Sequence, residues 1–471
     1  PVSDAAAAEH GETIAVRPMF GLFPASRLEP YRTGIGRTGR GGNLAFRLVA
    51  RSRSARAAWF GVRKLSAALP VARLLRAVRR RTESARTTWH SRAFKAAVSR
   101  TVLRRLPIRR GTVVFESHLG KQYSDSPRAI YEHLRATGVP MRPVWSYAGL
   151  SADGFPVEAR LVRRDSWAYY RALAQAEFWI DNQGFPAEAV KRPGTTYIQT
   201  WHGSAFKRMG LHEPSMQLAP RAARARLARM VDRFDCFLVR SEHDVHTLAQ
   251  GLGVRAELLP VGYPRNDALV TGGNPAKLDQ MRRELGLTDG RRALLYAPTF
   301  RPGPGGRAQP LQLPFDPERF VRELGHKYRL LVRAHYLSAQ PGLTTPCGTI
   351  LDVSEFDDVT SLLLVSDALI TDYSSIMFDF ALLDRPMVFH APDLENYARD
   401  RGSYFDLAER APGPLTEDED GLLETLAALE EQVEGYRPQR RRFVEDFGEF
   451  DSGTAAKAVA ERFFAPGLRR G

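Results

Sequence analysis

The sequence lacks long apolar runs and has almost no cysteine. Its 471 residues include two cysteines, Cys236 and Cys347, whose separation fits neither a metal site nor a CxxC pair. We therefore expect a reduced, intracellular protein, because disulfides mark oxidising compartments. The longest apolar candidate, residues 362–370, is interrupted by Ser366 and Asp367. A membrane-spanning helix needs about 20 apolar residues, so we expect a soluble or peripheral protein.

Common phosphate-binding and metal-binding motifs are also absent. There is no GxxxxGK[ST] loop and no GxGxxG fingerprint, which excludes a Walker A site and the usual dinucleotide fingerprint. Asp367 and Asp372 do not form a DxD pair, so the short-spaced carboxylate clamp for a divalent metal is missing. We therefore expect no metal site and no cofactor.

Acidic residues are scarce in the first part of the chain. Residues 1–110 hold 24 Lys and Arg against 5 Asp and Glu, a net charge of +19, whereas residues 111–471 hold 44 against 48. Residues 1–55 are rich in Gly, Arg, Ser and Ala, which predicts a disordered basic arm. In residues 56–110, apolar and basic side chains recur at helical spacing, which predicts a basic amphipathic helical extension with a break at Pro70.

The sequence leaves two interpretations of this extension open. In one, it lies on an anionic membrane surface with its arginines near the headgroups. In the other, it packs as a helical extension on the folded domain that follows. Nucleic-acid binding is not favoured, because no aromatic platform and no helix-turn-helix pattern accompany the charge.

After residue 110, strand candidates alternate with helical stretches. This order is typical of α/β proteins with parallel sheets, whose functional loops lie at the carboxyl ends of the strands. We predict two doubly wound Rossmann-type domains that face each other across a cleft, at residues 111–255 and 256–416, with closing helices at 417–471. The strand candidates are 112–116, 143–146, 178–181, 196–200 and 236–239 in the first domain, and 256–260, 293–297, 330–333, 368–371 and 387–390 in the second.

The segment YIQTWHGSAFK, at Tyr197–Lys207, follows a predicted strand. The loop then places His202 and the backbone amides around Gly203 in the cleft between the domains. Histidine suits general-base catalysis because its usual pKa lies near neutrality. The alternative is a packed structural histidine beside Trp201, and this segment alone does not decide between the two.

Two further strand ends carry polar groups. LLYAPTFR offers Pro298 and Thr299 to a ligand, or is an ordinary transition from strand to loop. LLVRAH ends on Arg333 and His335, which are two residues apart and so lie on one side of an extended chain. An arginine beside an imidazole suits a phosphate group, although solvent exposure explains such a pair equally well.

The segment SDALITDYSSIMFD, at Ser366–Asp379, is the most informative. A strand runs into Asp372, and a helix that begins near Ser374 and Ser375 offers amides and hydroxyls to a diphosphate. Asp372 is alternatively a helix N-cap. Asp379, one turn further on, either accepts a ribose hydroxyl or lies at the surface.

Taken together in this order, the segments resemble the CDP-glycerol glycerophosphotransferase family, the teichoic-acid primases and polymerases with a GT-B fold. The resemblance extends from about residue 114 to residue 413. The matching segments are Phe115–Leu134, Gln199–Lys207, Gly262–Asp267, Tyr296–Arg301, Arg333–Leu337, Ser366–Ala381 and Asp393–Asp406.

The resemblance implies that the C-terminal domain binds a CDP-activated polyol and that the N-terminal domain presents the acceptor. It implies that His202 removes a proton from an acceptor hydroxyl, that this oxygen attacks the β-phosphorus, and that CMP leaves. His335 is the second implied catalytic histidine. The other implied substrate contacts are Gly203, Ser204, Ala205 and Phe206 in the acceptor loop, Arg265, Arg333, His335, Ser374 and Ser375 around the diphosphate, and Pro298, Thr299 and Asp379 near the nucleotide or polyol.

The loop after His202 departs from the family pattern WHGTPLK. Ser204, Ala205 and Phe206 stand where the family has Thr, Pro and Leu, and without the fixed φ of proline the loop is looser or shaped for another acceptor. The donor is CDP-glycerol or CDP-ribitol, and the expected acceptor is a membrane-anchored, lipid-linked glycopolymer. Peripheral attachment to the cytoplasmic face of the membrane then follows from the basic residues 1–110.

Two alternatives remain at this stage. A nucleotide-sugar-dependent glycosyltransferase has the same two-domain GT-B fold. A different class is an inactive, polybasic, membrane-associated scaffold. The sequence does not indicate the oligomeric state, nor whether one unit or many are added.

Overall fold

The computed structural model describes residues 31–38, 43–50, 87, 89–149, 151–299, 311, 313–334, 344–345, 347–394 and 402–465. The chain divides into two compact units, residues 1–91 and 92–471, and each is described by itself. No helix within these ranges is both long enough and apolar enough to cross a membrane.

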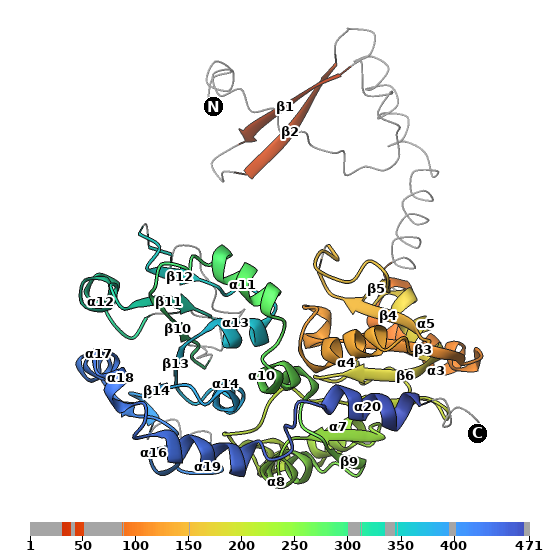
Figure 1. Cartoon of the computed structure of the whole chain (residues 1–471). Coiled ribbons are helices and arrows are strands. Elements are labelled where there is room, and N and C mark those ends of the chain that lie inside the picture. The colour runs from red at the N-terminus through yellow and green to blue at the C-terminus, as the bar shows by residue number, and fades with distance from the viewer. Residues whose placement is uncertain are drawn as a thin grey trace. The chain divides into compact units, whose positions relative to one another are not determined.

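The first unit contains an antiparallel pair of strands, β1 (Tyr31–Thr38) and β2 (Asn43–Ala50), drawn in red in Figure 1. The pair corrects the prediction of a disordered arm at these positions. Apolar residues alternate with others in NLAFRLVA, which is the period of a strand, and the surrounding glycines and arginines obscured that signal. The rest of the predicted arm and residues 56–86 of the predicted extension lie outside the described residues.

The N-terminal domain of the second unit is built on a seven-stranded parallel sheet of order β5-β4-β3-β6-β7-β8-β9. The strands are β3 (Arg109–Glu116), β4 (Arg142–Tyr147), β5 (Arg160–Arg163), β6 (Ala176–Asp181), β7 (Thr196–Gln199), β8 (Cys236–Val239) and β9 (Glu257–Pro260). The helices are α3 (Arg92–Thr101), α4 (Asp125–Ala136), α5 (Trp167–Gln175), α6 (Pro214–Gln217), α7 (Arg221–Val231), α8 (Glu242–Asp244), a π-helical turn at Val245–Ala249 and α9 (Gln250–Leu252).

The five strands predicted for this domain are present, and two further strands extend the sheet. β5 was not predicted, because its sequence RLVR has arginines at both ends and only one buried residue, Val162. β9 was predicted as the first strand of the second domain, and this was wrong: β9 pairs in parallel with β8, from Cys236 opposite Glu257 to Val239 opposite Pro260. The domain boundary therefore lies after residue 260 rather than at residue 255.

The C-terminal domain has a six-stranded parallel sheet of order β12-β11-β10-β13-β14-β15. Its strands are β10 (Arg292–Tyr296), β11 (Tyr328–Val332), β12 (Ile350–Asp352), β13 (Ala368–Thr371), β14 (Met387–His390) and β15 (Leu415–Thr416). Its helices are α10 (Asp267–Thr271), α11 (Pro275–Glu284), α12 (Pro317–Leu324), α13 (Val359–Val365), α14 (Ile376–Phe380), α16 (Leu407–Arg410), α17 (Glu419–Ala427), α18 (Leu429–Gln432) and α19 (Arg437–Phe447). The prediction of two doubly wound α/β domains is thus confirmed.

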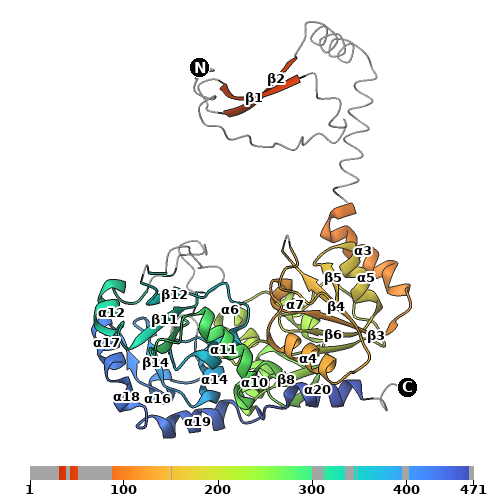
Figure 2. The same cartoon turned by 45° about the horizontal axis from the view of Figure 1, so that its top comes forward.

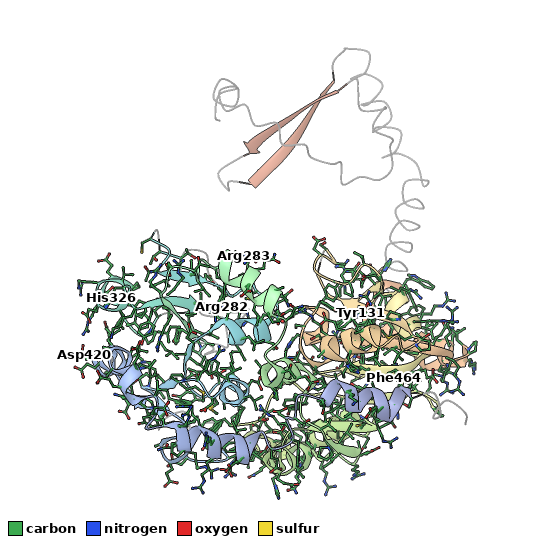
Figure 3. The ribbon with its side chains drawn as sticks, viewed as in Figure 1. Tyr131, Arg282, Arg283, His326, Asp420 and Phe464 are labelled. Carbon is green, nitrogen blue, oxygen red and sulfur yellow. The ribbon has the colours of Figure 1, made fainter. Side chains whose placement is uncertain are left out.

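One of the predicted closing helices packs on the N-terminal domain. α20 (Ala455–Phe464) returns to the N-terminal domain and lies beside α4, as Figure 2 shows. Phe464 packs against Phe178 of β6 with ring centroids 4.5 Å apart. It belongs to the same buried cluster as Tyr131 of α4, and Figure 3 labels both side chains. α20 follows the helices of the C-terminal domain and packs on the N-terminal domain, so it links the two domains.

Part of the predicted basic extension packs on the fold. Phe94 of α3 meets Trp167 edge-on, and the Lys95 ammonium group donates to the carbonyl oxygen of Asp165 at 2.7 Å. For residues 92–105 the second interpretation of the extension, a helical addition to the following domain, is therefore correct.

Candidate active site

The site is built around His202, in the loop that follows β7. The Nδ1 atom of His202 lies 2.7 Å from the carbonyl oxygen of Asn182, which follows β6. A carbonyl only accepts, so Nδ1 carries the proton and Nε2 is left with its lone pair. Burial lowers the pKa of this half-buried imidazole to about 4, against the opposite effect of the hydrogen bond to Asn182. His202 is therefore neutral at pH 7.

The backbone around His202 is held in unusual conformations. Trp201 has φ of 56° and Gly203 has φ of 139°. A Cβ atom on Gly203 would lie 3.1 Å from Oγ of Ser375 and 3.4 Å from Nη2 of Arg265. Only glycine fits here, and its backbone brings the loop of the N-terminal domain against Ser375 of the C-terminal domain.

The three residues after Gly203 turn into the protein. Ser204 is buried, and its hydroxyl lowers the pKa of Asp244, which burial itself raises. The carbonyl oxygen of Ala205 lies 2.8 Å from Nε2 of His243. Phe206 is 3% exposed and stacks on Tyr373 in the core of the C-terminal domain. These three residues were predicted as substrate contacts, and in the structure their buried contacts anchor the loop that follows His202.

Arg265 and Asp379 meet each other instead of facing outward. Nη2 of Arg265 lies 2.7 Å from Oδ2 of Asp379, and Nη1 lies 2.9 Å from Oδ2 of Asp125. The other oxygen of Asp379 accepts from Nη1 of Arg240 at 2.8 Å. Asp379 is therefore a buried partner of two arginines, which contradicts the prediction of a surface position, and a contact with the ribose stays a prediction.

The hydroxyls predicted to bind the donor lie at the carboxyl ends of β10 and β13. Ser374 is partly exposed and Ser375 is exposed, just before α14. α14 spans five residues, which is shorter than the helix on which the predicted dipole contribution depends. Thr299, next to Pro298, donates from its hydroxyl and its amide to Oδ1 of Asp372, at 2.7 and 2.8 Å.

Arg333 follows β11 and holds the loop after β12. Its Nη1 donates to the carbonyl oxygens of Phe356 at 2.5 Å and Val353 at 3.4 Å. Burial lowers the pKa of its guanidinium, although Asp357 and Asp358 lie near enough to oppose this. His335, predicted beside it, lies outside the described residues.

Sequence reasoning missed the polar residues that follow β3. Nε2 of His118 lies 3.3 Å from Oδ2 of Asp125, and the amide of His118 donates to Oδ1 of Asn182 at 2.9 Å. His118 and Asp125 have φ of 46° and 63°. The signal was present, because both residues lie in the segment Phe115–Leu134 of the family resemblance and follow a predicted strand.

Strained backbone therefore gathers at this edge of the sheet. His118, Asp125 and Trp201, all with positive φ, belong to two segments that meet at Asn182. Non-glycine residues with positive φ cost energy and persist at functional sites when the surroundings enforce them. In the described ranges, no group of three or more His, Cys, Asp or Glu side chains is arranged to hold a metal ion.

Two parallel α/β domains, with polar residues of both meeting between them, define a GT-B-like protein. The model of the CDP-Glycerol:Poly(glycerophosphate) glycerophosphotransferase family matches residues 98–465. The chain belongs to this family.

Individual relatives agree with this assignment. The chain is 34% identical over 360 residues to the teichoic acid poly(glycerol phosphate) polymerase of Staphylococcus epidermidis, covering 74% of this chain and 50% of the relative. It is 31% identical over 372 residues to the teichoic acid glycerol-phosphate transferase of Staphylococcus aureus, covering 77% and 95%. A solved structure of the wall teichoic acid polymerase TagF superposes with a TM-score of 0.73 at 30% identity, covering 84% of this chain and 98% of that one.

The share of each relative's length that this chain covers differs between the relatives. It spans about half the length of the Staphylococcus epidermidis and Bacillus subtilis polymerases and nearly all of the Staphylococcus aureus transferase. The shared part contains both α/β domains.

Proposed function

We propose that the protein transfers glycerol phosphate from CDP-glycerol to an acceptor hydroxyl and releases CMP, in the synthesis of a teichoic-acid-like or capsular glycopolymer. One observation carries the proposal beyond family membership. The carbonyl oxygen of Asn182 fixes the tautomer of His202 with Nε2 unprotonated, and the next residue, Gly203, approaches Ser375 of the opposite domain. A base and a set of phosphate-binding hydroxyls thus lie side by side.

His202 acts as the general base. Nε2 takes the proton of the acceptor hydroxyl, whose oxygen attacks the β-phosphorus of the donor. The new bond joins that oxygen to phosphorus, and the bond from the β-phosphorus to the bridging oxygen breaks. CMP leaves with the electron pair. A pKa of about 4 makes His202 a weak base in the free protein. The negative diphosphate raises this pKa when it binds, because it favours the imidazolium.

Ser374 and Ser375 hold the donor diphosphate, with Arg333 and His335 supplying positive charge, and no metal ion is required. His335 also acts as the second catalytic histidine. Pro298 and Thr299 line the nucleotide side. Phosphoryl transfer depends mainly on positioning and electrostatic stabilisation, and one well-placed donor is worth about 3 kcal/mol of barrier.

A panel of donors tests this function. Purified protein is incubated with a lipid-linked acceptor and CDP-glycerol, CDP-ribitol or a UDP-hexose, and CMP or UMP release is followed. We expect CMP release from CDP-glycerol to be fastest. Preference for CDP-ribitol would assign a ribitolphosphotransferase, UMP release would assign a glycosyltransferase, and no turnover with any donor would favour the inactive scaffold.

The acceptor and the location form a second part of the proposal. We propose that the acceptor is anchored in the membrane and that the basic residues 1–110 hold the protein at the cytoplasmic face. The concentration of positive charge in this region supports the proposal, because each Lys or Arg near an anionic surface contributes about 1 kcal/mol. Removal of residues 1–86 should reduce sedimentation with phosphatidylserine vesicles and leave turnover of a soluble acceptor intact. Equal sedimentation of both proteins would contradict this part alone.

A further inference from the structure

Arg265 lies between the two domains and was expected to bind the diphosphate. We propose instead that Arg265, clamped by Asp125 and Asp379, is a positioning residue that fixes the position of His202 relative to Ser375. This inference rests on the proposed function, because it assigns a role within that reaction.

Both terminal nitrogens of Arg265 already bind protein carboxylates. Each of its terminal nitrogens donates to a different carboxylate, Asp125 at 2.9 Å and Asp379 at 2.7 Å. Nε is buried with no hydrogen-bond partner, and the side chain is 11% exposed. The paired N–H groups that would grip a phosphate in a fork are therefore turned toward protein groups.

The charge balance around Arg265 also disfavours a phosphate. Together with Arg240 and Asp451, the network holds two guanidinium groups and three carboxylates, so it has no surplus of positive charge. Arg265 and His118 hold the pKa of Asp125 far below its usual range, although burial opposes them. A diphosphate that approached Arg265 would face both carboxylates, and electrostatic repulsion would oppose it.

The clamp joins elements that are distant in the sequence. Asp125 begins α4 in the N-terminal domain, whereas Asp379 lies in α14 of the C-terminal domain. Arg265 lies in the short 3₁₀ helix Pro264–Asn266 that connects the domains. An opposite charge from each domain thus fixes the connecting segment, and a change in the angle between the domains would break one of the two contacts.

A second arginine strengthens the same junction. Arg240, at the end of β8, has a fully buried side chain and pairs with Asp379 at 2.8 Å and with Asp451 at 2.5 Å. Asp451 precedes α20, the helix that returns to the N-terminal domain. Asn266 donates to both Asp379 and Asp451 at 3.2 Å. Asp379 is thus held from both sides of the junction.

Gly203 links this clamp to catalysis. Its missing side chain allows the backbone next to His202 to pack against both Arg265 and Ser375, at the distances given above. A movement of the guanidinium would therefore shift the loop that carries His202 relative to the donor serines. Displacement of a reacting group by about 1 Å costs about a hundredfold in rate.

The test replaces Asp125 by an uncharged isostere, Asp125→Asn. We expect kcat to fall by about 10- to 100-fold, while the KM for CDP-glycerol and the affinity measured by calorimetry change by less than about threefold. Glu132→Gln is the matched control, because Glu132 lies on the same helix and pairs with Arg128 at the surface. It should leave both constants unchanged.

The pH dependence of kcat/KM distinguishes the proposed role from a purely structural one, because a structural role would leave this dependence unchanged. Among the groups that act on His202, Asp125 raises its pKa whereas His118 and Arg265 lower it. The loss of the Asp125 charge should therefore move the acid limb of kcat/KM to lower pH. Asp125→Glu, which keeps the charge, should restore the limb and part of kcat.

Arg265→Lys covers the case in which Asp125→Asn does not fold. Lysine is a point charge that cannot hold two carboxylates in a fork, so kcat should fall with donor affinity kept. Amide hydrogen exchange in residues 202–206 should rise in either variant.

A donor affinity weakened tenfold or more in Arg265→Lys would overturn the inference and restore Arg265 as a phosphate ligand. Unchanged kcat in both variants would also overturn it. Failure of the proposed function gives a different result, because the wild-type protein itself would then release no CMP.

Discussion

The carboxyl edges of the two sheets carry different kinds of side chain. At the edge of the N-terminal sheet lie titratable groups, namely His118, Asp125 and His202. At the edge of the C-terminal sheet lie the hydroxyls of Thr299, Ser374 and Ser375. One edge is suited to moving a proton and the other to binding anionic oxygens. In our proposal each domain therefore supplies one half of the chemistry, and changes on either side should have separable effects.

The largest expected effect is on the proton-transfer side. His202→Ala removes the proposed base, so CMP release should fall by about 10²- to 10⁴-fold while CDP-glycerol still binds. Rapid-quench measurement of CMP and calorimetry of donor binding check the two halves separately. His246→Ala is the control, because this exposed imidazole of the same domain contacts the carbonyl oxygen of Glu242. Turnover retained in His202→Ala would show that the edge of the N-terminal sheet does not supply the base.

The second prediction concerns the residue that joins the edges. Phe206 belongs to the loop of the N-terminal domain but is buried in the core of the C-terminal domain. Phe206→Ala should lower the free energy of unfolding by about 3–5 kcal/mol, because it leaves a cavity. Denaturant unfolding measures this loss. Leu218→Ala, at a position that is 90% exposed, should have almost no effect. A loss below about 1 kcal/mol would mean that Phe206 does not anchor the loop.

The third prediction concerns the hydroxyl side. Ser374→Ala and Ser375→Ala should each weaken CDP-glycerol binding by about 10- to 100-fold, because a hydrogen bond to a charged group contributes about 1.5–3 kcal/mol. The pH dependence of catalysis should stay that of the wild type, in contrast to the Asp125 variant. Ser215→Ala, at an exposed position away from both edges, serves as the control. Unchanged affinity by calorimetry would count against the serines as ligands of the diphosphate.

The sequence allowed the hydroxyl side to be predicted more fully than the titratable side. The apolar run of β13 predicts where that strand ends, and Ser374 and Ser375 come shortly after this end. Their position in the sequence was therefore enough to predict that they lie at the edge of the sheet. Arg265 is 140 residues from Asp125 and 114 from Asp379, and no local period indicates which partners a guanidinium will find at such distances.

The same limit explains the errors in the fold. β9 has an ordinary strand pattern, and only its pairing with β8 shows to which sheet it belongs. The return of α20 to the N-terminal domain likewise depends on contacts of Phe464 with residues nearly 300 positions earlier, such as Phe178. The sequence predicted a strand and closing helices in these regions, whereas long-range packing determines which domain each element joins.

The fourth prediction concerns how two buried histidines contribute to the pH dependence of stability. Burial lowers the pKa of both His202 and His243 from 6.5 to about 4. Between these values the unfolded chain holds protons on both imidazoles that the folded chain does not, so the stability that these two histidines contribute falls as pH decreases from 6.5 toward 4. Burial raises the pKa of Asp181 to about 7, and this carboxyl contributes in the opposite direction, so the test compares slopes between variants. Melting temperature measured across this window checks the slope. His243→Gln should flatten it and His246→Gln should not, and equal slopes in all three proteins would contradict the assignment.

The smallest expected effect is that of a chelator. The carboxylates on the donor side are already engaged, since Asp372 accepts from Thr299 and Asp379 from two arginines. These partners compete with a divalent cation for the carboxylate oxygens, whereas serine hydroxyls can donate hydrogen bonds to a diphosphate and cationic side chains can offset its charge. We therefore expect CMP release to continue unchanged after dialysis against EDTA. A loss that Mg²⁺ restores would show that the phosphates themselves recruit a metal to the hydroxyl side, and that side would then require a cation in addition to its own donors.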